Sequence, residues 1–212
     1  MTKPILIAID GPSASGKGTV AKKLAAQFNL PYLNTGALYR AVAWRLIVQG
    51  ISLANFPENI DILTKDIDQD DLENEELFSE KTGEIASNIA KNPILRQKLV
   101  DFQRNFIENG ILNQNGAVLD GRDIASTIMP EANYKFYITA DVEIRANRRF
   151  KQLSEKGDKV SYDEILAQLQ ARDDNDKNRA NSPLSIDKNA IIIDNGNLNA
   201  QETFMKALDL IK

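Results

Sequence analysis

Short runs of consecutive apolar residues alternate along the chain with longer segments in which apolar residues recur every three or four positions. The runs predicted to be strands lie at residues 5–9, 31–33, 117–119, 134–139 and 190–193. Each run is apolar at nearly every position, so the strands are expected to be buried on both faces of a sheet. Such strands, separated by helices, predict an α/β fold with a parallel sheet flanked by helices.

The segments between the apolar runs carry a helical spacing. Val20, Leu24 and Phe28 recur every four residues in the first predicted helix, 19–28. The other predicted helices cover 34–50, 55–66, 82–91, 93–109, 141–155, a segment that begins at Ser161, and 201–211. Ser161 and Glu164 have the spacing of a capping box.

Three breaks are expected in this pattern. Gly110 is predicted to end the helix at 93–109. The acidic segment 66–76 has few apolar residues and is expected to be a loop or a mobile segment. The helix that begins at Ser161 is expected to lose its regular structure over the polar residues 173–178.

The first predicted strand runs directly into a glycine-rich turn. That turn consists of Gly11, Pro12, Ser13, Ala14, Ser15, Gly16, Lys17, Gly18 and Thr19. Glycines allow backbone N–H groups to converge on phosphate oxygens, and the following helix points its positive end at the same anion. Lys17 is placed to reach the β- and γ-phosphates, although the hydroxyl expected next comes one position late, at Thr19. We therefore predict a phosphate-binding loop of the P-loop NTPase type.

Composition narrows the chemistry that such a loop could serve. The 212 residues include neither cysteine nor histidine, which excludes thiol catalysis, disulfides and imidazole bases. The chemistry that remains uses carboxylates, Mg²⁺ held by oxygen, or cationic groups that clamp phosphates. Phosphoryl transfer needs only Mg²⁺ and the cationic groups. The net charge of −4 argues against a nucleic-acid partner. Without a signal peptide or an apolar stretch of membrane length, we expect a cytoplasmic protein with no membrane partner.

Polar residues follow the predicted strand at 117–119. Asp120 could hold Mg²⁺ through water, or could cap the turn before Gly121, and both readings remain open. For direct contact with Mg²⁺ the first choice is Thr19. Arg122 and Asp123 lie in a loop at the end of the strand, where a ligand role is favoured over a surface ion pair.

Arginines gather in the C-terminal half of the chain. Arg145, Arg148 and Arg149 share one side of a predicted helix, and Arg172 and Arg179 bracket the polar stretch after the next one. They could form a solvated face with salt bridges to nearby aspartates. As a group they favour a lid that brings guanidinium groups over a transferring phosphate.

A second anion site is predicted at the start of the helix at 34–50. Thr35, Tyr39 and Arg40 place a hydroxyl, a ring and a guanidinium within its first turns. After a phosphate loop, this arrangement is typical of the site for the phosphoryl acceptor.

Four stretches together resemble one family. The loop Gly-Lys-Gly-Thr at 16–19 resembles that of nucleoside monophosphate kinases, and residues 35–40, 120–123 and 172–179 resemble bacterial cytidylate kinases. The resemblance implies transfer of the γ-phosphoryl group of ATP to CMP or dCMP, with Mg²⁺, giving ADP and CDP or dCDP. It also implies a monomer whose partners are these nucleotides.

The resemblance also implies individual roles. Gly11 to Thr19 would hold the ATP phosphates, and Arg40 and Arg122 the acceptor phosphate, with Thr35 and Tyr39 in the same pocket. Ser87, Arg96 and Asp123 resemble the residues that read the base; Arg172 and Asp176 resemble those near the sugar, and Arg179 a further arginine of the pocket. The residues expected to take part in catalysis are Lys17, Arg122, Arg149, Arg172 and Arg179.

The predicted domain is single, residues 1–212, and has three parts. A core (1–60, 111–150, 185–212) carries an insert that binds the monophosphate, at about 61–110, and an arginine-bearing lid, at about 151–182. Many bacterial members carry a longer, partly β insert between the helices at 55–66 and 82–91, whereas the corresponding stretch here, 66–81, is short and acidic. Two alternatives remain: a P-loop kinase for another nucleoside monophosphate, or an ATP-dependent regulatory switch.

Overall fold

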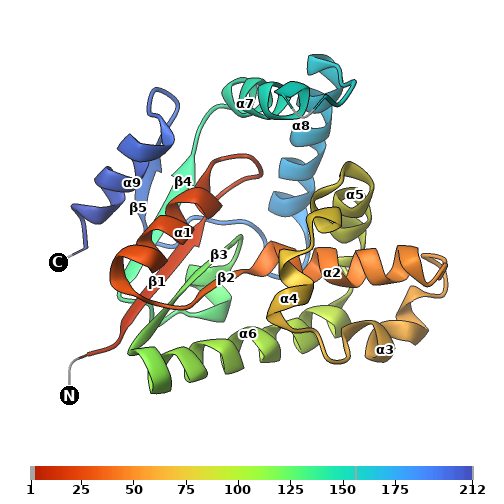
Figure 1. Cartoon of the computed structure of the whole chain (residues 1–212), viewed down its shortest axis with the longest axis horizontal. Coiled ribbons are helices and arrows are strands. Elements are labelled where there is room, and N and C mark those ends of the chain that lie inside the picture. The colour runs from red at the N-terminus through yellow and green to blue at the C-terminus, as the bar shows by residue number, and fades with distance from the viewer. Residues whose placement is uncertain (1–2, 156, 212) are drawn as a thin grey trace. The chain divides into compact units, whose positions relative to one another are not determined.

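The computed structural model describes residues 3–155 and 157–211. Within them five strands form a sheet in the order β2-β3-β1-β4-β5 (Figure 1). The strands are β1 (Ile5–Asp10), β2 (Tyr32–Asn34), β3 (Gly116–Gly121), β4 (Tyr134–Thr139) and β5 (Ile191–Asp194). β1 pairs in parallel with β3 and β4, and β4 with β5. The predicted α/β fold with a parallel sheet is confirmed.

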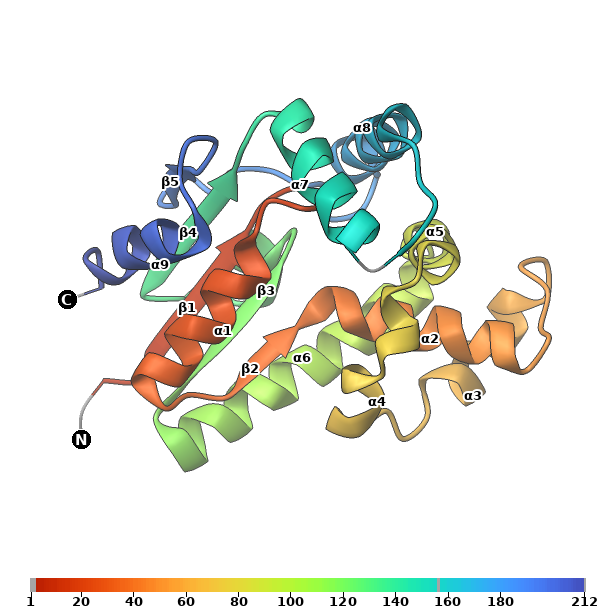
Figure 2. The same ribbon diagram turned by 45° about the horizontal axis from the view of Figure 1, so that its top comes forward.

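The chain divides into two compact units, residues 1–33 with 107–212, and residues 34–106. The first unit contains the sheet, α1 (Lys17–Phe28), α7 (Val142–Glu155), α8 (Tyr162–Asn178) and α9 (Ala200–Leu208). It also contains η3 (Ile124–Ile128), a turn of π-helix. α1 packs against α9, and α7 lies beside α8 (Figure 2).

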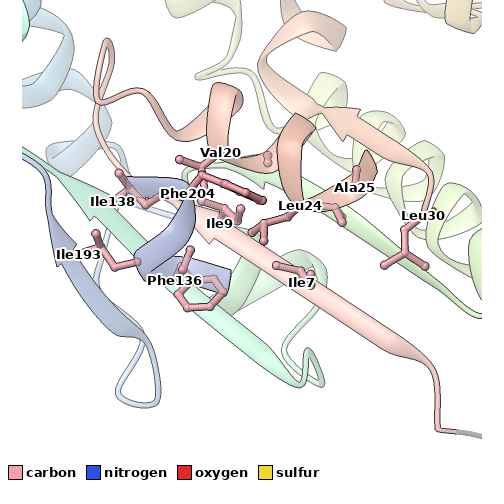
Figure 3. Close-up of a cluster of buried hydrophobic side chains, with 13 residues drawn as sticks. Ile7, Ile9, Val20, Leu24, Ala25, Leu30, Phe136, Ile138, Ile193 and Phe204 are labelled. Carbon is pink, nitrogen blue, oxygen red and sulfur yellow. The ribbon is translucent and has the colours of Figure 1, made fainter. Parts of the chain in front are cut away.

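The core of the first unit lies between the sheet and these two helices, α1 and α9 (Figure 3). Ile7, Phe136 and Ile193 from three strands pack with Leu24 of α1 and Phe204 of α9. Leu24 is fully buried, so its truncation to alanine is expected to cost about 2–5 kcal/mol. β1 lies in the middle of the sheet and is buried on both faces, as predicted.

The prediction of burial on both faces is wrong for β5. This strand is at the edge of the sheet, and Ile191 and Ile192 are 40% and 53% exposed. An apolar run therefore does not distinguish a central strand from a short edge strand.

The second unit is helical. It contains α2 (Thr35–Val48), η1 (Phe56–Asn59), α3 (Ile60–Thr64), α4 (Gln69–Glu73), η2 (Glu75–Phe78), α5 (Glu80–Ile89) and the first part of α6 (Pro93–Gln114). α2 packs against α5, and also contacts α3, α4 and η2. α2 belongs to this unit, which begins at residue 34.

The helix predicted at 55–66 is broken. Phe56–Asn59 forms a 3₁₀ turn with Pro57 at its start, and a short α-helix follows at Ile60–Thr64. The loop predicted at 66–76 is also wrong in part, because it contains the helical turns α4 and η2. Asp68 caps α4 in a capping box with Asp71, and Asp71 accepts a 2.6 Å hydrogen bond from Arg45 of α2.

Gly110 does not end α6, which continues to Gln114. A Cβ at position 110 would lie 2.5 Å from the carbonyl oxygen of Gly116 and 3.0 Å from Pro31, so glycine permits close packing there. The chain leaves the helix through Asn115 and Gly116, both with positive φ. Position 110 therefore requires glycine for close packing and not, as the sequence suggested, for ending the helix.

α8 does not lose its regular structure at 173–178 but extends to Asn178, and Ser161 caps it in the predicted capping box. Asp173 and Asp176, one turn apart, are paired with Arg145 and Arg122. These ion pairs hold the polar turns that were expected to be irregular. No helix within residues 3–155 and 157–211 is both long and apolar enough to cross a membrane.

Candidate active site

The glycine-rich turn lies between the carboxyl end of β1 and the start of α1. Gly11 has a φ of 152°, and a Cβ there would overlap the carbonyl oxygen of Ile138. Gly16 has a φ of 81° and directly precedes α1. Ala14 is also left-handed, with a φ of 59°. Close packing and left-handed backbone therefore shape the predicted phosphate loop, as its glycines indicated.

Lys17 begins α1 and is 8% exposed. Its Nζ donates to the carbonyl oxygen of Pro12 at 3.1 Å. Burial lowers the pKa of Lys17 to about 7, and the positive charge of Arg122 acts in the same direction. Asp120 and Asp176 oppose this shift only in part. A group bearing several negative charges would restore the charged form of Lys17, which suits a site for polyphosphate.

Asp120, at the end of β3, lies beside the start of α1. A Cβ on Gly18 would be 3.8 and 3.9 Å from its two carboxylate oxygens. The hydroxyl of Tyr32 donates to Asp120 at 2.6 Å. Burial raises the pKa of Asp120, while Lys17 and the Tyr32 hydrogen bond lower it. Tyr32 was not identified from the sequence, since no local motif marks it.

These side chains suit a magnesium ion in chemical terms. Asp120 supplies carboxylate oxygens and Thr19 a hydroxyl on the exposed side of α1, and oxygen is the ligand that Mg²⁺ prefers. Among the described residues no group of three or more acidic side chains forms a metal cage.

Arg122, Asp123, Asp176 and Arg179 lie together in the first unit. Arg122 Nε donates to Asp176 at 2.7 Å, and Arg179 lies 3.5 Å from Asp123 and 3.9 Å from Asp176. Burial acts to raise the pKa of Asp176, but Arg122, Arg179 and Arg172 together outweigh it, so that the pKa is lowered. The structure thus joins four of the residues predicted to contact CMP, Arg122, Asp123, Asp176 and Arg179, in one cluster of ion pairs.

Asp10 fixes the loop that carries Arg122. Its two carboxylate oxygens accept hydrogen bonds of 2.9 Å from the backbone N–H groups of Ile124 and Ala125. Burial raises the pKa of Asp10 to about 6 although both hydrogen bonds oppose the shift. The signal in the sequence was an acidic residue that directly follows a buried strand, but its partners lie more than 110 residues away.

The three arginines of α7 that were predicted to share one helix face have different hydrogen-bond partners. Arg145 is buried and donates to the carbonyl oxygens of Ala140 and Ser13 and to Asp173. Arg148 donates to the side chain and carbonyl of Asn195. In this structure the donors of Arg145 and Arg148 are thus directed at other parts of the first unit, among them Ser13 of the phosphate loop. Arg149 donates to Gln152 on its own helix.

Asn195, after β5, was missed by the sequence analysis. Its side-chain amide donates to the carbonyl oxygen of Ser15 at 2.8 Å, and its backbone N–H donates to Thr139. It therefore holds the phosphate loop from the far end of the chain. A single asparagine in a loop carries no sequence signal for this contact.

The remaining predicted residues belong to the second unit. Thr35 begins α2 and is buried. Arg40 donates to the carbonyl oxygens of Leu77 and Ser79. The guanidinium of Arg96 lies 5.7 Å from the centre of the Tyr39 ring, within cation–π range. Ser87 lies on α5 and is half-buried.

A strand, a glycine-rich turn and a helix that opens with a buried lysine, on a parallel sheet, define the class of P-loop proteins. Among solved structures, an uncharacterized protein from Eubacterium ventriosum ATCC 27560 has a TM-score of 0.54 at 22% identity, covering 99% of this chain and 98% of that one. A gluconokinase from Sinorhizobium meliloti 1021 has a TM-score of 0.51 at 14% identity, covering 99% and 92%. These likenesses show the fold alone.

Sequence comparison identifies the family. The family model for cytidylate kinase matches residues 7–212. The cytidylate kinase of Acidiphilium cryptum (strain JF-5) is 43% identical over 211 residues, with 100% of this chain and 97% of the relative covered. That of Bartonella tribocorum (strain CIP 105476 / IBS 506) is 44% identical, with 99% and 95% covered. The chain belongs to the cytidylate kinase family.

Proposed function

We propose that the protein transfers the γ-phosphoryl group of ATP to CMP or dCMP, giving ADP and CDP or dCDP. The observation that supports this is the family match over residues 7–212, in a chain that keeps Lys17 in an intact phosphate loop. An ATP-dependent switch is less well supported, since the chain also carries the arginines expected to hold an acceptor.

ATP would be held by the loop from Gly11 to Thr19. Its N–H groups and the N-terminus of α1 would bind the phosphates, and Lys17 would regain its charge against them. Arg122 would fix the phosphate of the acceptor, and Arg40 is assigned the same role. The acceptor is already an ionised phosphate, so positioning and charge neutralisation suffice without a strong base. This suits a chain that has no histidine.

Closure over the phosphates is assigned to Arg172 and Arg179, with Arg149. Arg122 already has one carboxylate partner, Asp176, at 2.7 Å. A phosphate that binds Arg122 would therefore share it with Asp176 or replace that carboxylate. We expect Asp176 to turn towards the sugar hydroxyls of CMP, as the family resemblance implies.

Mg²⁺ would be held by Thr19 and, through water, by Asp120, together with phosphate oxygens. Bound there, the ion would neutralise charge on the phosphates of ATP. Tyr32 would keep Asp120 in place through its 2.6 Å hydrogen bond.

Selection of cytosine is assigned to Ser87, Arg96 and Asp123. A carboxylate at Asp123 would accept from the N4 amino group, and Arg96 would donate to the acceptors N3 and O2. Uracil presents an oxygen in place of the amino group, which leaves a carboxylate facing an acceptor.

The test is a coupled assay of ADP release with ATP and Mg²⁺, offering CMP, dCMP, UMP and AMP separately. We expect turnover with CMP and dCMP well above that with UMP or AMP. Equal turnover with all four would contradict the assignment of the base-reading residues. No turnover with any acceptor would overturn the kinase proposal.

A further inference from the structure

Two arginines from different elements meet at one residue of the phosphate loop, Ser13. Arg122, from the loop after β3, donates to the Ser13 hydroxyl at 2.8 Å. Arg145, from α7, donates to the Ser13 carbonyl oxygen at 3.0 Å. One arginine thus holds the side chain of Ser13 and the other its backbone.

Both arginines are in turn held by α8. Arg145 donates to Asp173 at 2.6 Å, and Arg122 donates to Asp176 at 2.7 Å. The two aspartates are three residues apart and therefore lie on the same side of the helix. Two parallel bridges, each from a carboxylate through an arginine to Ser13, connect α8 with the phosphate loop.

Stability alone does not account for the bridge through Arg145. Asp173 and Arg145 are 7% and 4% exposed, and the second carboxylate oxygen of Asp173 is buried without a hydrogen-bond partner among the described residues. Burial of such an ion pair costs desolvation energy, and well-packed apolar residues at the same positions often give a fold of equal or greater stability. The pair is better explained by the orientation that it gives to the backbone of the loop.

We propose that Asp173 and Arg145 are positioning residues that set the Ser13 peptide for binding of ATP phosphates, and that the Ser13 hydroxyl positions Arg122 for the acceptor. The first bridge acts on the donor nucleotide and the second on the acceptor, and Ser13 joins them. The role of Ser13 in positioning Arg122 rests on the proposed function, because it requires CMP as the acceptor. The role of Asp173 and Arg145 in ATP binding does not.

The first arm of the test compares Asp173→Asn with Asp174→Asn, a matched change at the exposed neighbouring position. The amide introduced at position 173 keeps an acceptor for Arg145 but not the charge. We expect the Kd for ATP, measured by calorimetry well below Tm, to rise about tenfold in Asp173→Asn, the loss of a charge-assisted contact. Asp174→Asn should bind ATP like the wild type. A lowered Tm with unchanged ATP affinity would mean a purely structural pair and would overturn the proposal for Asp173 and Arg145.

The second arm uses Ser13→Ala and Ser13→Thr, which keep the backbone carbonyl that Arg145 binds. We expect Ser13→Ala to raise KM for CMP several-fold more than KM for ATP, and Ser13→Thr to restore most of the difference. Two results would overturn the proposal that the Ser13 hydroxyl positions Arg122: equal rises in KM for CMP and KM for ATP in Ser13→Ala, or a KM for CMP in Ser13→Thr that stays as high as in Ser13→Ala. If Asp173→Asn does not fold, Arg145→Lys takes its place in the same ATP titration. A raised Kd for ATP would then support the role of Arg145 in setting the Ser13 peptide, and an unchanged Kd would overturn it.

The two proposals fail in different ways. A wild-type protein that binds ATP but does not phosphorylate CMP would overturn the proposed function. The ATP titrations of the Asp173 and Asp174 variants would still decide whether α8 positions the loop.

Discussion

The last turns of α8 and the segment 66–76 are both rich in aspartate, and arginines hold both of them in helical turns. In α8, Asp173 and Asp176 are paired with Arg145 and Arg122, with side chains that are 5–19% exposed. In the second unit Arg45 and Asp71 form the corresponding pair, at 17% and 29% exposed. The same kind of sequence therefore adopts regular structure in a buried and in a more exposed setting.

The two regions differ in what else the arginines bind. Arg145 and Arg122 both reach Ser13 in the phosphate loop. Arg45 instead donates to the carbonyl oxygens of Leu63, Lys65 and Asp66, which precede its partner Asp71 by five to eight residues. Pairing in α8 thus organises a site, whereas pairing around Arg45 organises a local turn. Acidic composition alone does not distinguish these outcomes from a mobile loop.

Of the variants that test the difference between α8 and the segment 66–76, Arg122→Ala should have the largest effect. We expect kcat/KM for CMP to fall on the order of 10³-fold, because a positioned guanidinium is lost from the acceptor phosphate and from Ser13. Arg45→Ala should stay within about twofold of the wild type in the same steady-state assay. Comparable losses in both variants would remove the distinction between the two regions.

Buried charge in the first unit should also give a pH dependence. The pKa of Asp10 is about 6 in the folded protein against an ordinary 3.8. Between these values the folded protein keeps a proton that the unfolded chain releases, so the contribution of Asp10 to stability falls as the pH rises from about 4 through about 6. At about 1.36 kcal/mol per pKa unit, this amounts to about 3 kcal/mol.

The measurement is urea unfolding of the wild type and of Asp10→Asn at about pH 4 and about pH 7. We expect the stability of the wild type relative to the variant to be about 2–3 kcal/mol lower at the higher pH than at the lower. The asparagine does not titrate and so isolates the carboxylate. A difference that does not change with pH would contradict a buried, protonatable Asp10.

Arg45→Ala should have its effect on the second unit. Loss of its hydrogen bonds to three carbonyl oxygens and to Asp71 is expected to cost about 1–2 kcal/mol of stability, since the groups are only half-buried. Amide hydrogen exchange at 66–76 should accelerate, while exchange in α8 should stay as in the wild type. Acceleration in α8 as well would mean that the two regions are not independent.

Asp71→Asn should have the smallest effect. The Arg45–Asp71 pair is partly exposed, and such pairs contribute up to about 1 kcal/mol. The amide introduced at position 71 still accepts a hydrogen bond, so urea unfolding should show a loss below that of Arg45→Ala. A larger loss than in Arg45→Ala would show that the carboxylate, not the carbonyl contacts, organises the segment.

Local patterns in the sequence predicted the fold and the phosphate loop. The order of strands and helices, the glycines of the loop and the capping box at Ser161 each depend on residues within about ten positions. The acidic helical turns could not be predicted in the same way. They depend on arginines 26 to 54 residues away, as with Asp71 and Arg45, or Asp176 and Arg122.

In the candidate site, too, only the residues marked by a local sequence pattern could be predicted. Strand ends marked Asp120, Arg122 and Asp123 as residues near the loop, since carboxyl ends of parallel strands share one edge of the sheet. The contacts of Tyr32 and Asn195 depend on how separate segments are placed by the fold. Single residues without a motif give no signal of this kind.

The central place of β1 has a consequence for the order in which the protein can be assembled. β1 carries the phosphate loop at its end, yet both of its neighbours in the sheet, β3 and β4, lie beyond residue 115. During synthesis the first strand made must remain unpaired until more than half of the chain has left the ribosome. Pairings of such long sequence separation close slowly, so the phosphate loop, encoded first, is expected to become structured late.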